Sequence, residues 1–87
     1  MKVKNGFVLR EVVGEIVVLP TGEAAASFNS LITLNETGKF LWEKLAVDVS
    51  EDELVSALLQ EYEVSEEIAR QDVRNFINIM RENDLLA

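Results

Sequence analysis

Residues 31–45 divide this chain into a β-rich half and a helical half. Their sequence, Leu-Ile-Thr-Leu-Asn-Glu-Thr-Gly-Lys-Phe-Leu-Trp-Glu-Lys-Leu, starts as a short strand-like apolar run and continues with helical spacing. Asn35 stands at the boundary, where its short side chain can accept the N–H of the second or third helical residue. Gly38 falls in the first turn, where glycine usually weakens a helix. We therefore expect a close approach of the chain at Gly38.

The residues before this joint predict an antiparallel sheet. Residues 7–13 and 15–20 are rich in β-branched side chains and are separated by Gly14, which indicates a hairpin. We expect Gly14 and Glu15 to be the central residues of a type II′ turn, because glycine readily adopts the positive φ of its first position. After an irregular loop at residues 23–30, residues 31–34 predict a third strand at an edge of the sheet.

Three helices are expected after the joint. The first covers about residues 36–45. The second opens with a capping box, in which Ser50 and Glu53 satisfy each other's backbone N–H groups. The third is capped by Ser65 and extends to about residue 83.

The chain length suits one small domain, which we place at residues 1–87. Its fold class is predicted to be α+β, with a three-stranded antiparallel sheet from the N-terminal part packed on three C-terminal helices. Apolar residues of both halves should form one core: Val18, Ile32, Leu34, Phe40, Leu41, Leu58, Val73, Phe76 and Met80.

Composition and charge exclude several classes of function. Sixteen acidic residues against eight basic ones give a net charge of −8, which disfavours binding to nucleic acid. The chain has neither His nor Cys, so the usual general bases, nucleophile partners and soft metal ligands are absent. We predict no catalytic residues, no metal and no cofactor. The absence of disulfides, of an export signal and of a membrane span predicts a cytoplasmic protein.

Three arginines form a stripe with one aliphatic residue on the third predicted helix. The spacing i, i+4, i+7 and i+11 places this stripe beside the core face: Arg70, Arg74, Ile77 and Arg81. Two interpretations are open at this point. The stripe is either a solvated flank that pairs with local acids such as Glu66 and Glu67, or a binding strip for an extended acidic and apolar peptide.

Several segments resemble the PqqD family of peptide chaperones. They span nearly the whole chain: Gly6-Phe-Val-Leu-Arg-Glu-Val12, Val17-Val-Leu-Pro-Thr-Gly22, Leu31-Ile-Thr-Leu-Asn-Glu-Thr-Gly38, Phe40-Leu-Trp-Glu-Lys-Leu45 and Ala69-Arg-Gln-Asp-Val-Arg-Asn-Phe76. The resemblance implies a winged-helix-like fold that recognises ribosomally made, later modified peptides. It also implies that the leader segment of a precursor peptide adds as a strand against the third strand, in a groove walled by the third helix.

The resemblance and the stripe together suggest a peptide-binding site. Backbone pairing along the third strand would supply affinity. The third helix would supply specificity, with its arginines against carboxylates and Ile77 against an apolar side chain. The predicted peptide-binding residues are Leu31, Ile32, Thr33, Leu34, Asn35, Arg70, Val73, Arg74, Ile77 and Arg81. The implied partners are a precursor (leader) peptide and a modifying enzyme, such as a radical SAM maturase or a leader peptidase.

Two other functions are considered beside this one. A winged-helix DNA-binding protein is disfavoured by the net charge and by an element order that puts all strands first. A structural dimerisation module would pair the same edge strand with its copy, and a homodimer of this kind is compatible with the sequence.

Overall fold

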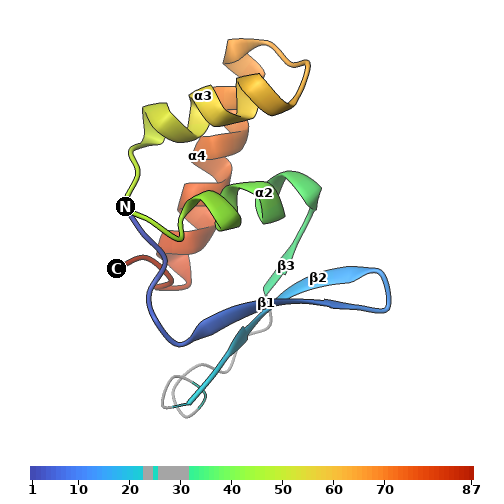
Figure 1. The fold of residues 1–87 in the computed structure, drawn as a ribbon, viewed down its shortest axis with the longest axis vertical. Coiled ribbons are helices and arrows are strands. Elements are labelled where there is room, and N and C mark those ends of the chain that lie inside the picture. The colour runs from blue at the N-terminus through green and yellow to red at the C-terminus, as the bar shows by residue number, and fades with distance from the viewer. Residues whose placement is uncertain (23–24, 26–31) are drawn as a thin grey trace.

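A computed structural model describes residues 1–22, 25 and 32–87. In Figure 1 the sheet lies at one end of the molecule and the helices lie together at the other. The described elements are, in chain order, β1 (Phe7–Val12), β2 (Glu15–Pro20), β3 (Ile32–Leu34), α2 (Glu36–Lys44), α3 (Glu51–Glu61) and α4 (Glu66–Glu82). This order confirms the predicted α+β fold. The loop predicted at residues 23–30 and the first predicted residue of the third strand, Leu31, lie outside the described residues.

The hairpin between β1 and β2 has a different turn from the predicted one. Val12 pairs with Glu15, so the two loop residues are Val13 and Gly14. Both have positive φ, at 50° and 79°, which is typical of a type I′ turn. The predicted type II′ turn centred on Gly14 and Glu15 is therefore wrong by one residue. A β-branched residue such as Val13 rarely adopts positive φ, which is why the sequence did not indicate this turn.

β2 lies at the centre of the sheet, between β1 and β3. Ile16 of β2 is opposite Leu34 of β3, and Val18 of β2 is opposite Ile32 of β3. These four side chains are buried, whereas Thr33 between them is exposed. The alternation along β3 indicates that the face carrying Ile32 and Leu34 packs on the helices, whereas Val17 of β2 is buried outside that core cluster.

The joint between β3 and α2 is built as the sequence predicts. Asn35 has extended backbone geometry, and its side-chain oxygen accepts the Gly38 N–H at 2.8 Å. A Cβ atom on residue 38 would lie 3.2 Å from Asn35 Oδ1 and 3.2 Å from Leu34 Cβ. The expected close approach is thus confirmed, because any side chain at Gly38 would press on the capping oxygen and on the last residue of β3.

The caps of α3 and α4 also agree with the sequence. Ser50 Oγ accepts the Glu53 N–H at 3.1 Å, and the Glu53 carboxylate accepts the Ser50 N–H at 3.1 Å. At α4, Ser65 Oγ accepts the Ile68 N–H at 3.2 Å. Each helix therefore begins at the predicted residue, with part of its unpaired N–H groups satisfied.

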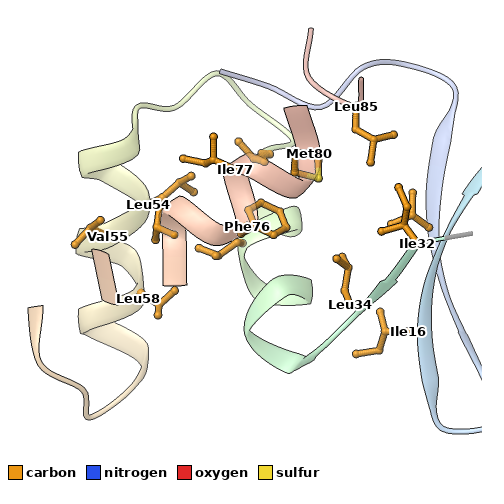
Figure 2. Close-up of a cluster of buried hydrophobic side chains, with 14 of the residues drawn as sticks. Ile16, Ile32, Leu34, Leu54, Val55, Leu58, Phe76, Ile77, Met80 and Leu85 are labelled. Atoms are coloured by element: carbon orange, nitrogen blue, oxygen red, sulfur yellow. The ribbon is translucent and has the colours of Figure 1, made fainter. Parts of the chain in front are cut away.

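The core joins one face of the sheet to all three helices. Figure 2 shows Ile32 and Leu34 of β3 on one side of Phe76, with Leu54 and Leu58 of α3 on the other. Most predicted core residues are buried: Val18, Ile32, Leu34, Leu41, Leu58, Val73, Phe76 and Met80. The prediction missed other fully buried side chains, among them Leu45, Leu54 and Leu85.

Phe40 is a correction to the predicted core, because it is only half-buried and lies at the rim. Its ring meets that of Tyr62 edge-on, with 5.6 Å between centroids. The Lys44 ammonium lies 5.0 Å from the centre of the Phe40 ring. On α2 the deeply buried position is Leu41, and Phe40 is rotated by about 100° from it around the helix.

The segments near the two ends of the chain lie side by side. The Lys4 N–H donates to the Leu85 carbonyl at 2.8 Å, and the Ala87 N–H donates to the Lys2 carbonyl at 2.8 Å. Leu85 is fully buried beneath this pairing. The end of α4 is thereby tied to the segment that precedes β1.

The type I′ turn leads to a first prediction, on stability. Val13 is 98% exposed and makes few contacts that a substitution could lose, yet it holds positive φ. Val13→Asn places the preferred Asn-Gly pair in this turn and should raise the free energy of unfolding by about 0.5–1 kcal/mol. Denaturant titration measures the difference. Val47→Asn, at a 64% exposed position without positive φ, is the matched control and should change the stability by less than about 0.5 kcal/mol.

Candidate functional site

β3 has an open edge. Among the described residues its only strand partner is β2, so its opposite side faces no strand. A strand edge of this kind presents backbone N–H and C=O groups that can pair with an added peptide.

The hairpin determines which backbone groups point outward. A type I′ turn closes with a hydrogen bond between its flanking residues, and the bonding direction alternates along an antiparallel strand. Because Val12 and Glu15 flank the turn, Ile16 and Val18 direct their backbone groups toward β3. Leu34 and Ile32, which lie opposite these residues, direct their own backbone groups toward β2. The N–H and C=O of Thr33, between them, therefore point toward the open edge.

A cleft of about 440 Å³ lies beside this edge. Its walls come from β3, from the start of α2 and from one flank of α4. Phe76 and Leu41 are buried apolar residues at its wall, and Ile79 is a 41% exposed apolar residue there. The polar side chains from α4 are Asp72 and Asn75. We name Asp72, Asn75 and Ile79 the cleft flank of α4.

The predicted arginine stripe lies elsewhere on α4. Arg70 Nη1 donates to Asp52 Oδ1 at 3.0 Å and to Glu51 Oε2 at 3.3 Å. Arg74 Nε donates to the same Glu51 oxygen at 3.5 Å. The hydrogen bond with Asp52 is the largest cause that raises the pKa of Arg70. Arg70 and Arg74 therefore pair with local acids, as one interpretation held, but those acids belong to the first turn of α3.

Ile77 and Val73 belong to the core. Ile77 is 2% exposed and Val73 is fully buried. Neither side chain is therefore accessible on the surface of α4, where the sequence predicted that Ile77 would contact an apolar side chain of the peptide. In Figure 2, Ile77 and Leu54 lie to one side of α4, and Leu34 lies to the other. A residue that borders the core at helical spacing can face either neighbour, and here the neighbour is α3.

The two flanks of α4 point in different directions. Arg74 and Ile79 are about 140° apart around the helix. We name Arg70, Arg74 and Arg81 the arginine flank. None of its residues lines the cleft, and Arg81 forms no ion pair within the described part of the chain. The structure thus brings Thr33, Leu34 and Asn35 together with the cleft flank and not with the arginines.

Sequence reasoning missed the cleft flank. Its residues fall at i, i+3 and i+7, and those of the arginine stripe fall at i, i+4, i+7 and i+11. Both spacings are helical, so spacing alone did not distinguish the two flanks. The one signal available was Ile79, a large apolar residue outside the main core positions. A peptide contact for the arginines remains a prediction.

A second hollow of about 570 Å³ shares no lining residue with the cleft. It lies between the segment before β1 and the end of α2, next to Trp42. Across residues 1–22, 25 and 32–87 no group of His, Cys, Asp and Glu is placed to hold a metal ion. Nor does any helix there have the length and apolar character needed to span a membrane.

Comparison with known proteins gives a family and a fold. The family model described as Coenzyme PQQ synthesis protein D (PqqD) matches residues 15–86. No curated protein matches the chain at a significant level. Two solved structures have a TM-score of 0.74 to it. One is TbiB1 in complex with the TbiA(beta) leader peptide, at 24% identity over 99% of this chain and 94% of that chain. The other is a lasso peptide synthetase B1 complexed with the leader peptide, at 20% identity over 99% and 95%.

The second prediction concerns the free protein. If Thr33 directs its N–H to the open edge, this amide should exchange with solvent faster than the amides of Ile32 and Leu34, which face β2. Hydrogen exchange followed by nuclear magnetic resonance resolves the three residues. Equal protection of all three would show that the edge is covered in solution.

Proposed function

The chain belongs to the PqqD family, and we propose that it acts in the cytoplasm as a non-catalytic peptide chaperone. It binds the leader segment of a ribosomally made precursor peptide and presents that peptide to a modifying enzyme. One observation carries the proposal: the open edge of β3 lies directly beside a cleft walled by α4. The structures of TbiB1 and of the lasso peptide synthetase B1, which share the fold, were both determined with leader peptides and support it.

The leader binds as an added strand. It pairs with the N–H and C=O of Thr33 and extends along residues 31–35, as predicted from the sequence. Main-chain hydrogen bonds of this kind supply affinity with little dependence on the leader's side chains. Because side chains alternate along a strand, every second residue of the leader faces the cleft.

Specificity comes from the cleft. An apolar side chain of the leader packs between Phe76 and Ile79 and covers the exposed surface of Ile79. We assign Arg70 and Arg74 to a different role, since both hold α4 against the first turn of α3 through Glu51. Arg70 and Arg74 therefore contribute to the shape of the site rather than to its contacts.

The chemical modification of the peptide belongs to a partner. A chain without His or Cys lacks the side chains that most often act as general base or nucleophile. A radical SAM maturase or a leader peptidase would carry out that step on the bound precursor.

The third prediction tests strand addition. Synthetic leader segments of short precursor peptides encoded beside the gene are added while backbone exchange is measured. A binding leader should slow the exchange of the Thr33 amide and leave Ile32 and Leu34 unchanged, because of these three residues only Thr33 gains a new partner. Binding without protection of Thr33 would contradict the proposed site.

Two further measurements separate the other functions. A dimer whose sedimentation does not respond to any leader would favour a structural dimerisation module. Salt-dependent binding to duplex DNA, with no leader bound, would favour a DNA-binding protein.

The fourth prediction tests the cleft flank. Ile79→Glu should lower leader affinity tenfold or more, about 1.4 kcal/mol, because it places a charge where an apolar side chain is buried. Its stability should change little, since Ile79 is 41% exposed. Isothermal titration calorimetry measures the affinity.

Two matched variants on the same helix complete this test. Ile68→Glu makes the same substitution at a 51% exposed position outside the cleft and should leave affinity within about twofold. Arg74→Glu lies outside the cleft and should weaken binding far less than Ile79→Glu does, although it repels Glu51. If Arg74→Glu weakens binding as much as Ile79→Glu, specificity belongs to the arginine flank.

A further inference from the structure

Asp72 places a carboxylate without a partner in the cleft. Its side chain is half-buried and lines the wall formed by α4. All eight basic residues of the chain lie in its described part: Lys2, Lys4, Arg10, Lys39, Lys44, Arg70, Arg74 and Arg81. None of them forms an ion pair with Asp72, and within those described ranges the Asp72 carboxylate accepts no hydrogen bond from a side chain or a backbone N–H. Water is what solvates this carboxylate in the free protein.

A bound leader removes that water. A carboxylate that loses its hydration without gaining a partner opposes binding, whereas a cation or a strong N–H donor on the peptide compensates for most of that loss. No lysine or arginine of the chain pairs with Asp72, so the bound peptide has to supply the cation. A leader with Asp or Glu at this position would add like-charge repulsion to the desolvation cost.

The other charges around the cleft also favour a basic peptide over an acidic one. The positive end of α2 borders it, but Asn35 already accepts the Gly38 N–H there and Glu36 stands in the first turn. Asp72 is the only charged residue that lines the cleft in the described structure. The net charge of −8 also raises the local concentration of basic peptides over acidic ones.

We propose that this cleft selects leader segments in which a Lys or Arg pairs with Asp72 and an apolar residue packs on Ile79. The two side chains lie on the same face of the added strand. Asp72 and Ile79 are seven residues apart on α4, about 10 Å along its axis. Same-face residues of a strand recur every ~6.6 Å, so the basic and apolar residues stand two or four positions apart. This inference rests on the proposed function and names the substrate class of that site.

The test selects peptides from a random library. Fifteen-residue peptides made by messenger RNA display are captured on the unaltered protein, on Asp72→Lys and on Glu67→Lys. Glu67 is an exposed acid of α4 outside the cleft, so both variants change the net charge equally. The unaltered protein and Glu67→Lys should enrich Lys or Arg over Asp or Glu about tenfold, two or four positions from an aliphatic or aromatic residue. Asp72→Lys should reverse that preference.

The outcomes distinguish this inference from the proposed function. If the selected peptides protect the Thr33 amide but show no basic preference, or if Asp72→Lys selects like Glu67→Lys, the charge selection is overturned and strand addition stands. If nothing is enriched, or if the selected peptides leave Thr33 unprotected, both proposals fall. Circular dichroism confirms that the variants fold. Should Asp72→Lys unfold, Asp72→Asn replaces it and should abolish the preference without reversing it.

Discussion

The joint at Asn35 is the constraint on which the site depends. One side-chain oxygen caps α2 at 2.8 Å, and the same turn leaves only 3.2 Å between the Cβ position of residue 38 and Leu34. A cap contributes only about 1 kcal/mol to stability, so its importance is geometric. It fixes the direction in which β3 enters α2, and therefore the distance between the open strand edge and α4. Glycine at residue 38 is what allows the strand and helix to meet this closely.

α4 carries two surfaces of different character on either side of one buried face. Its core residues, such as Val73 and Met80, bury whole side chains and dominate the energy. The ion pairs from Arg70 and Arg74 to Glu51 are partly exposed, and such pairs contribute little to stability. The buried residues of α3, such as Leu54 and Leu58, are therefore what hold it against α4. With α3 covering that flank, the flank that carries Ile79 stays open. The packing of α3 thus decides which surface of α4 is available for a ligand.

Most of the fold was predictable because its signals are local. Asn35, Ser50 and Ser65 cap the helices they were expected to cap, since capping depends on residues three positions apart. The site was predictable on its strand side only. Helical spacing shows that Ile77 borders the core, but not whether α3 or β3 covers it, and that choice depends on contacts distant in sequence. Val13 was missed for another reason, because a turn can impose positive φ on a residue that disfavours it.

The net negative charge of the chain affects how readily its open strand edge pairs with a second copy of the protein. An unpaired edge can join the edge of a second copy as readily as it joins a peptide, which is a recognised route to aggregation. β3 limits this risk in one way, because the part of this strand that the structure describes pairs with β2 over three residues, Ile32–Leu34, and offers a short edge. The net charge of −8 limits it in another, since two copies repel each other at long range while a basic peptide is attracted. Asp72, which is half-buried beside the edge, has the same effect at short range, because its carboxylate repels acidic groups and attracts basic ones. Repulsion between two acidic copies and attraction of a basic peptide are therefore two results of the same negative charge.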